Sequence, residues 1–337
     1  MNAATRILMS PQSVVLIAAL VFALVIGIIN PNFLSVATIV DLLRNSLVTA
    51  IFALGVMMVL ASGGIDVSFP AIGAFAMYTT TTLVLGVDFS VPVAMLFVVS
   101  AIIGAALGLV NGILIGGLGL PTLIVTLGTL SLYRGILLTF VGTTYITNVP
   151  RNVISFARTM IVRMENAVGQ LASLPLSFVV LVGVTAFVAV LMNLTKFGRA
   201  IYAIGGSEEG ARRIGIKVGR TKMMIYVIVG AIAGLAGMTH MTLSRMANPF
   251  DLVGMELNVI AAVVLGGARI TGGHGTVTGT LLGALLITMI NTSLLSAGVP
   301  SYWQRVVVGT LIIVGTGLPI IIDRLAKRRE RLAQASV

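Results

Sequence analysis

Long runs of apolar residues, separated by short polar connections, occupy most of the chain from residue 14 onward. A run of roughly 20 apolar residues is long enough to cross the hydrocarbon core of a membrane as a helix. The runs are continuous, whereas strands of a membrane barrel alternate apolar and polar positions in segments of about 10 residues. The pattern therefore predicts an all-α integral membrane protein with about ten transmembrane helices. The expected spans are residues 14–29, 39–61, 69–86, 91–116, 121–141, 174–194, 223–240, 256–265, 277–297 and 303–322.

Composition excludes several other classes of protein. Of the 337 residues, 58% are hydrophobic and only 9% are charged, whereas a soluble domain carries about a quarter charged residues. The chain has no cysteine, which excludes a disulfide framework, a thiolate nucleophile and a cysteine metal site. We therefore expect residues 1–337 to form one transmembrane domain, without a metal site, a cofactor or a catalytic centre.

The distribution of basic residues predicts the orientation of the chain. The formal net charge of +11 does not indicate nucleic-acid binding, because the basic residues lie between and after the apolar runs. Ten spans place both termini on the same side of the membrane. With that side cytoplasmic, the inner segments hold fourteen lysines and arginines and the outer segments hold four, as the positive-inside rule requires. The loop 195–222 and the basic tail 324–337 are therefore expected in the cytoplasm.

The cytoplasmic loop 195–222 contains the signals of a short helix. Ser207 is a good N-cap, and the two acidic residues after it suit the positive end of the helix dipole. Each acidic residue is followed four positions later by an arginine, in the favoured order, and Gly215 suits the position just past the helix end. Two turns of helix are not stable alone in water, so we expect this segment to dock on a partner protein. It consists of Gly206, Ser207, Glu208, Glu209, Gly210, Ala211, Arg212, Arg213, Ile214, Gly215 and Ile216.

Two glycine-rich segments connect spans, at residues 62–68 and 265–276. Paired glycines permit sharp turns and positive φ angles, and Asp66 with Ser68 suits the cap of the helix that follows. A bend beside a solute pathway is the functional alternative for the first segment. The second segment lacks the Gly-Lys-Ser/Thr ending of a phosphate-binding loop, so nucleotide binding is not expected. The residues expected to form structural turns are Gly63, Gly64, Asp66, Gly266, Gly267, Gly272 and Gly273.

Several polar side chains lie inside the predicted spans. An ionisable residue in a span is a candidate for function, whereas asparagine more often holds membrane helices together. Thr38 and Asp41 form a capping-box pattern, which predicts a helix start at the outer interface. The candidates for a solute pathway are Arg44, Asn45, Asn111, Asn258 and Asn291.

A weak internal repeat includes two of these candidates. Asn111 and Asn291 each precede a proline between spans and then a Gly-Thr-Leu sequence in the next span, at residues 128–130 and 309–311. In the ten-span topology the two copies run in opposite directions. Inverted repeats of this kind are a known transporter architecture, with the pathway at their interface. Chance recurrence of common residues is the alternative explanation.

Three motifs together resemble one family of transport proteins. The segments SGGIDVS, FGRAIYAIGGSEEGARRIGI and ELNVIAAVVLGGARITGGHGTVTGTLLGALL are similar to those of the ribose/xylose/arabinose/autoinducer-2 permeases of ABC importers, and the likeness covers nearly the whole chain. The resemblance implies a permease subunit that pairs with a second permease subunit, identical or not, in the bacterial inner membrane. It also implies separate ATPase subunits, a periplasmic solute-binding protein and a coupling role for Gly206 through Ile216.

The sequence leaves more than one possibility for the transported solute and for the source of energy. A sugar or sugar-like polar solute is expected, and a nucleoside or branched-chain amino acid is the alternative within the same superfamily. A secondary transporter is the alternative of another class. The spans contain no chain of acidic residues and histidines, as a proton-coupled pump would require, so an ATP-driven permease is favoured.

Overall fold

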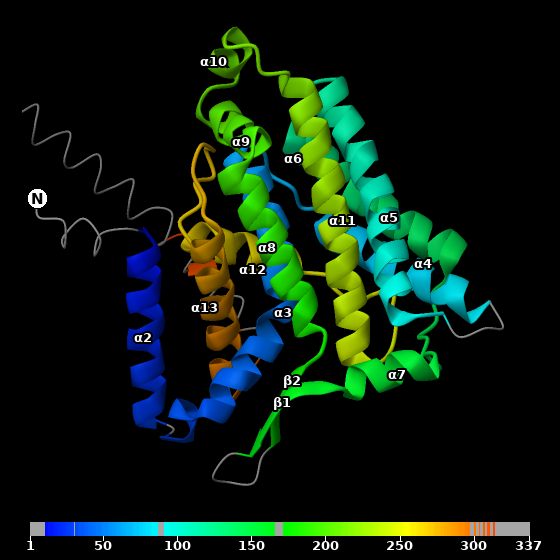
Figure 1. Cartoon of the computed structure of the whole chain (residues 1–337), viewed down its shortest axis with the longest axis vertical. Coiled ribbons are helices and arrows are strands. Elements are labelled where there is room, and N and C mark those ends of the chain that lie inside the picture. The colour runs from blue at the N-terminus through cyan, green and yellow to red at the C-terminus, as the bar shows by residue number, and fades with distance from the viewer. Residues whose placement is uncertain are drawn as a thin grey trace, which may run out of the picture.

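The computed structural model describes residues 11–29, 31–86, 91–165 and 171–296, together with residues 300, 303, 306, 309, 310 and 313. Most of these residues lie in helices (Figure 1). In the first half the elements are α2 (Pro11–Ile29), η1 (Pro31–Leu34), α3 (Val36–Ala61), α4 (Phe69–Leu85), α5 (Val93–Gly112), η2 (Ile113–Gly117), α6 (Thr122–Ile136) and η3 (Leu137–Val141). The second half contains α7 (Arg151–Arg158), β1 (Met160–Glu165), β2 (Leu171–Pro175), α8 (Phe178–Leu194), α9 (Lys196–Gly206), α10 (Glu208–Arg213), α11 (Val218–Ser244), α12 (Met255–Leu265) and α13 (Val277–Ser296).

Helix α3 forms the centre of the domain. Its residues from 50 to 61 are all buried, and α11, α13, α12 and α8 pack around it. The side chain of Ser35 caps the helix by accepting a hydrogen bond of 3.2 Å from the Thr38 N–H. The predicted capping box at Thr38 and Asp41 is therefore wrong, because the helix has already begun at Val36, just after Ser35.

Glycines allow α5 and α11 to approach backbone to backbone. A Cβ atom built on Gly104 would lie 2.1 Å from the Gly230 carbonyl oxygen, and one on Gly108 would lie 2.2 Å from the Tyr226 oxygen. Ser100 adds a hydrogen bond of 2.8 Å from its hydroxyl to the carbonyl oxygen of Gly234. Small residues drive such contacts in lipid, because helices there associate by close packing rather than by the hydrophobic effect.

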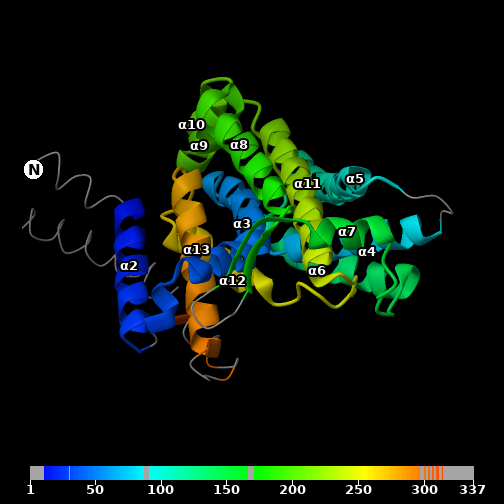
Figure 2. The same ribbon diagram turned by 60° about the horizontal axis from the view of Figure 1, so that its bottom comes forward.

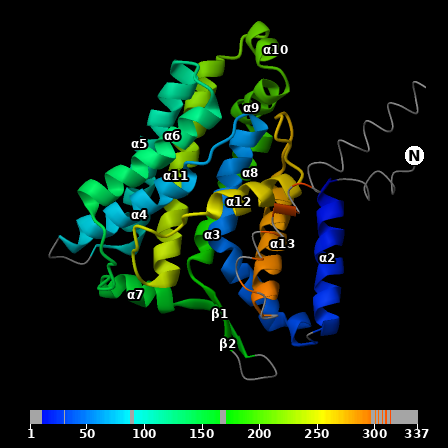
Figure 3. The ribbon, with the colours of Figure 1, turned by 180° about the vertical axis from the view of Figure 1, so that it is seen from behind.

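A close backbone contact at a glycine also joins α12 to α13. A Cβ atom on Gly283 would lie 1.9 Å from the Ala262 carbonyl oxygen. Helix α12 crosses the middle of the molecule beside α3 and α13, and α2 lies at the margin against α13 (Figures 2 and 3). The buried face of α2 contacts α13 through Val15, Leu286, Met289 and Ile290.

The polar stretch 142–173 folds into structure that the apolar pattern does not predict. It contains α7 and the antiparallel pair β1–β2, with Val162 opposite Leu174. The hairpin and α7 lie at the end of the molecule opposite α10 (Figure 1). Ile146 exchanges backbone hydrogen bonds of 2.9 and 3.0 Å with Ala247, which ties this region to the segment between α11 and α12.

The helices account for the predicted spans to different degrees. Five helices of the described chain are long and apolar enough to cross a membrane, and a sixth is counted if α8 and α9, bent by 71°, are one span. Three shorter apolar helices, at 15–28, 69–85 and 255–265, fall on further predicted spans. Most of the predicted span 303–322 and the whole tail 324–337 lie outside the described residues. A helical, multi-pass membrane protein is therefore confirmed, whereas the number of ten, the inverted repeat and the cytoplasmic termini stay predictions.

Candidate functional site

The short helix α10 has the local structure that its sequence predicts. The hydroxyl of Ser207 accepts a hydrogen bond of 3.1 Å from the Gly210 N–H. Glu208 binds Arg212 at 2.8 Å and Lys222 at 2.6 Å, and Glu209 binds Arg213. Beyond the helix, Gly215 has a φ angle of +85°. The helix thus begins and ends at residues suited to those positions.

The ion pairs of Glu208 fix its charge. Hydrogen bonds from Lys222 and then from Arg212 lower the pKa of the Glu208 carboxyl below its usual range. A lowered pKa in the folded state means that the pairs stabilise α10 at neutral pH and lose this effect as the pH falls through the pKa. Because the Glu208 side chain is 41% exposed, solvent screening keeps the contribution small.

One face of α10 is anchored and the opposite face is free in the chain as described. Ala211 is buried against Ile204 of α9 and Val218 of α11. By contrast, Ile214 is 74% exposed, and the side chains of Arg212 and Arg213 are exposed as well. Helix α10 stands at one extreme of the molecule (Figure 1), so it offers a charged surface with an apolar residue at its end.

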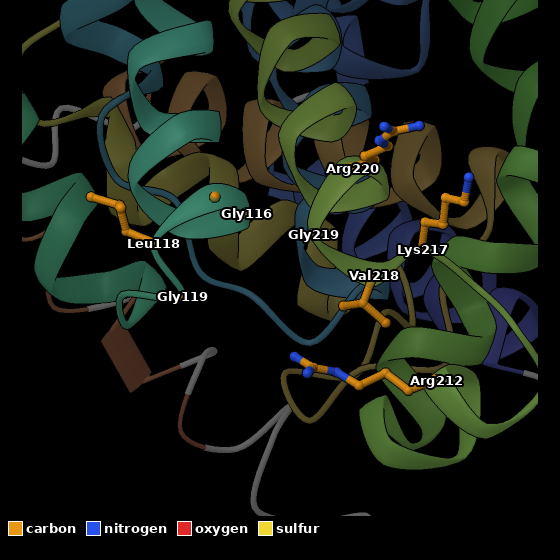
Figure 4. Close-up of a pocket in the computed structure, with 9 residues that line it drawn as sticks. Gly116, Leu118, Gly119, Arg212, Lys217, Val218, Gly219 and Arg220 are labelled. Atoms are coloured by element: carbon orange, nitrogen blue, oxygen red, sulfur yellow. The ribbon is translucent and has the colours of Figure 1, made fainter.

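An open hollow lies beside α10. Its volume is about 540 Å³, and it separates the connection between α5 and α6 from the first turn of α11 (Figure 4). Arg212 extends toward it from α10, whereas Lys217 and Arg220 lie on its α11 side (Figure 4). The residues that line it are Gly116, Gly117, Leu118, Gly119, Arg212, Lys217, Val218, Gly219 and Arg220.

Glycine turns fasten the 195–222 loop to the central helix. Gly63 and Gly272 have φ angles of +80° and +90°, and a Cβ atom on Gly272 would lie 2.7 Å from the Gly205 oxygen and 2.8 Å from the Gly63 Cα. The N–H of Gly273, itself at φ +75°, donates a hydrogen bond of 2.9 Å to the Ala61 oxygen. The end of α3, the end of α9 and the 266–276 segment therefore meet at one point.

The remaining predicted turn residues also occupy crowded positions. Gly267 has a φ angle of +92°. Gly64 and Gly266 have no positive φ, but a Cβ atom on Gly64 would lie 3.1 Å from the Tyr226 hydroxyl and one on Gly266 would lie 2.4 Å from the Gly279 oxygen. A side chain at either position would meet a neighbouring helix.

Asp66 belongs to a buried polar cluster that joins three helices. Its Oδ1 atom accepts hydrogen bonds of 2.7 Å from both the N–H and the hydroxyl of Ser68. Asn111 of α5 donates to the Ser68 hydroxyl at 2.8 Å, and Tyr133 of α6 donates to the Leu107 oxygen at 2.8 Å. Asp66, Ser68 and Asn111 are each at most 1% exposed. The cluster therefore fixes the α3–α4 connection against α5 and α6.

Substitution of Asn111 distinguishes a role in helix packing from a role in the solute pathway. Replacing Asn111 with Leu is expected to lower the free energy of unfolding by about 1–3 kcal/mol, because the buried Ser68 hydroxyl loses the hydrogen bond that it accepts from Asn111. Asn291→Leu should cost less, since Asn291 is only half-buried. Thermal unfolding of the detergent-purified variants measures both. Unchanged melting of Asn111→Leu together with lost uptake would instead support the pathway role.

The other pathway candidates lie apart from this cluster in the sequence and in the fold. Arg44 and Asn45 lie on α3 ahead of its fully buried part, Arg44 half-buried and Asn45 exposed. Asn258 lies half-buried on α12 and Asn291 half-buried on α13. Their contribution to a pathway stays a prediction.

Two features of the structure were missed in the sequence. Arg134 of α6 forms an ion pair of 2.7 Å with Glu256 of α12. The glycines at 104, 108, 112 and 116 repeat every fourth residue, which is the spacing of a membrane helix-packing motif. The glycine spacing is readable from the sequence, whereas the choice of Glu256 as partner for Arg134 depends on the fold.

The fold defines a multi-pass helical membrane protein that carries an exposed, charged helix at one end. Residues 38–315 match the family model described as the permease component of the branched-chain amino acid transport system. The chain belongs to this family of permease components, and the predicted family resemblance is confirmed.

Curated relatives place the chain among import permeases. It is 35% identical to the ribose import permease protein RbsC of Bacillus subtilis (strain 168), over 90% of each chain. It is 34% identical to the galactose/methyl galactoside import permease protein MglC of Escherichia coli (strain K12), again over 90% of each chain. Identity to the autoinducer 2 import system permease protein LsrC of Enterobacter sp. (strain 638) is 32%, over 91% of this chain and 85% of the relative. No solved structure matches the chain.

Proposed function

We propose that the chain is the membrane-spanning permease subunit of an ATP-driven importer that moves a sugar or sugar-like polar solute into the cytoplasm. The observation that carries the proposal is α10, a capped and charged helix that projects from the membrane domain and is fastened through α9 to α3. A permease without a nucleotide-binding loop must receive the energy of ATP through a contact, and α10 provides one. The partners are ATPase subunits on the cytoplasmic side and a solute-binding protein on the periplasmic side.

The class of solute follows from the relatives. The relatives described above are named for ribose, galactose and autoinducer 2, which are sugars or a sugar-like molecule. The family description names branched-chain amino acids, so an amino-acid permease is the second candidate. The identities of 32–35% over most of the chain to sugar importers favour a sugar.

Uptake by the complete transporter tests the function. The chain would be produced with its ATPase and solute-binding protein, reconstituted into liposomes and supplied with labelled ribose, galactose or leucine. ATP-dependent accumulation of a sugar, absent when the ATPase is omitted, is expected. Accumulation of leucine would support the second candidate, and accumulation without ATP would indicate a secondary transporter.

Orientation is tested with a reporter at the C-terminus. We propose that both termini, the loop 195–222 and the tail 324–337 face the cytoplasm of a bacterial inner membrane, because basic residues are concentrated in the inner segments. A reporter that works only in the cytoplasm should be active when it is fused after Lys327. A reporter that works only in the periplasm should be inactive at the same position. The reverse pattern would contradict the ten-span topology.

A further inference from the structure

The hollow beside α10 lies where three membrane helices end. Two of the candidate spans, Val93–Gly117 and Thr122–Val141, meet at the short connection that forms one wall, and a third, Val218–Ser244, begins at the opposite wall. Helix α10 stands farther out, at the extreme of the molecule (Figure 1). Because the spans end at the hollow, it lies level with the surface of the membrane.

The hollow carries basic side chains whose charge is only partly compensated. Lys217 and Arg220 lie on its α11 side, and Arg212 extends toward it from α10 (Figure 4). Arg212 shares its charge with Glu208 at 2.8 Å, whereas the ion pairs found among the described residues do not include Lys217 or Arg220. None of the described residues that line the hollow is acidic. The hollow therefore attracts an anion.

The start of α11 adds backbone groups to the same wall. Its N-cap residue, Lys217, makes no side-chain hydrogen bond to the first turn, and the positive end of a helix dipole favours a negative charge at this place. A Cβ atom on Gly219 would lie 2.4 Å from the Gly116 carbonyl oxygen, so the two walls touch each other. The basic side chains are thus held on two packed helices and not on a free tail.

An exposed apolar surface continues from the opposite wall of the hollow into α6. Leu118 and Leu120 are 67% and 43% exposed, and in the first turn of α6 Leu123 and Ile124 are 42% and 68% exposed. A free phosphate ion makes no contact that requires such a surface. A membrane lipid, by contrast, places its headgroup at the membrane surface and its acyl chains beside the apolar side chains of the spans. The basic hollow together with the apolar surface therefore favours a lipid over a free anion.

We propose that the hollow binds the phosphate headgroup of an anionic lipid, with Lys217 and Arg220 as its charged ligands. Basic pockets between membrane helices on the cytoplasmic side suit such headgroups. The acyl chains of the lipid lie along Leu118, Leu120 and the start of α6. The site does not depend on the transported solute, and only its assignment to the cytoplasmic leaflet rests on the orientation proposed above.

Lipid binding by the full chain, purified in detergent, tests the site. Native mass spectrometry during titration with phosphatidylglycerol gives a dissociation constant for the first bound lipid, and phosphatidylcholine, whose headgroup has no net charge, should bind more weakly. Lys217→Gln and Arg220→Gln should each raise the dissociation constant for phosphatidylglycerol about fivefold, and both together about 25-fold. The exchange of Lys217→Arg with Arg220→Lys keeps both charges and should bind as the original chain does.

Lys196→Gln combined with Arg199→Gln is the matched control. Both residues are exposed in the same 195–222 loop but do not line the hollow, so the dissociation constant should stay unchanged. An equal loss of binding in the control and in the Lys217→Gln, Arg220→Gln protein would overturn the proposal, because it would show diffuse attraction to a basic surface. Thermal unfolding of each variant, expected to be unchanged for these exposed side chains, separates lost binding from lost folding.

Two further measurements distinguish the lipid from other anions. Inorganic phosphate in tenfold excess over phosphatidylglycerol should not displace the lipid, and full displacement would assign the hollow to a free anion. Unchanged lipid binding by the Lys217→Gln, Arg220→Gln protein, together with loss of its co-purification with the ATPase, would assign the hollow to an acidic surface of the ATPase instead. Because lipid binding is measured on the chain alone, it does not depend on the outcome of the uptake experiment.

Discussion

Proline at position 211 is expected to abolish transport and solute-stimulated ATP hydrolysis while the membrane domain still inserts. The Ala211 N–H donates a hydrogen bond of 2.9 Å to the Ser207 oxygen, and its side chain is 2% exposed against α9 and α11. Proline removes that bond and clashes with the preceding turn, at a cost of about 3 kcal/mol or more. A helix of six residues has too few other stabilising interactions to remain folded after this loss.

Co-purification with the ATPase, together with ATP hydrolysis in the presence of solute and binding protein, measures the effect. Ala211→Ser is the matched control, because it keeps the N–H and nearly the same volume, and it should retain coupling. Reversing Glu208 and Glu209 to Lys should act in the same direction but more weakly, by about 0.3–1 kcal/mol per residue, through the lost pairs and the helix dipole. An Ala211→Pro protein that binds the ATPase and transports at the wild-type rate would show that α10 is not the coupling element.

Features encoded by neighbouring residues were predictable from the sequence. Helix α10 depends on a cap and on ion pairs within four residues, and both are visible in the stretch from Ser207 to Arg213. The long spans follow from apolar runs, so the expected 121–141 compares with Thr122–Val141 and the expected 39–61 with Val36–Ala61. The error at the start of α3 arose because Ser35 and Thr38 are both acceptable caps, and propensity alone does not choose between them.

Features that depend on distant partners were not predictable in the same way. Asn111 was recognised as a polar residue in a span, but its partner Ser68 is 43 positions away, and only the packing of α5 against the α3–α4 connection selects it. The hairpin of β1 and β2 lies in a polar stretch without a strong alternating pattern. Its strands are held by pairing with each other and by packing of Ala172 and Leu174 against α3, which are tertiary effects.

The contacts around α9 suggest how a movement of α10 reaches the membrane interior. Ala211 couples α10 to α9, the hydroxyl of Tyr202 on α9 donates to the Gly275 oxygen at 2.7 Å, and Gly273 bonds the end of α3. The segment 266–276 continues directly from α12, which carries Glu256. One continuous set of contacts thus links α10 through α9 and the 266–276 segment to α12, which carries the ion pair with Arg134.

Alanine at position 108 is expected to destabilise the membrane domain, whereas alanine at position 183 is not. A Cβ atom on Gly108 would lie 2.2 Å from the Tyr226 oxygen and 3.0 Å from the Gly230 Cα, both backbone atoms of α11 that cannot rotate away. Relief requires α5 and α11 to separate, and overpacking of this kind costs about 1–3 kcal/mol or more. At Gly183 of α8, by contrast, a Cβ atom would meet no atom within 4 Å.

Gly108→Ala and Gly183→Ala should therefore have different effects on the melting temperature. Gly183→Ala gains helix propensity of up to about 1 kcal/mol without a steric penalty, so its melting temperature in detergent should stay equal or rise. Gly108→Ala should melt at a lower temperature, and Gly108→Val, with its larger side chain, should fail to accumulate as folded protein. Because α11 begins within the 195–222 loop, at Val218, Gly108→Ala should also weaken the coupling of ATP hydrolysis to transport. Equal melting temperatures for Gly108→Ala and Gly183→Ala would contradict the close backbone contact between α5 and α11.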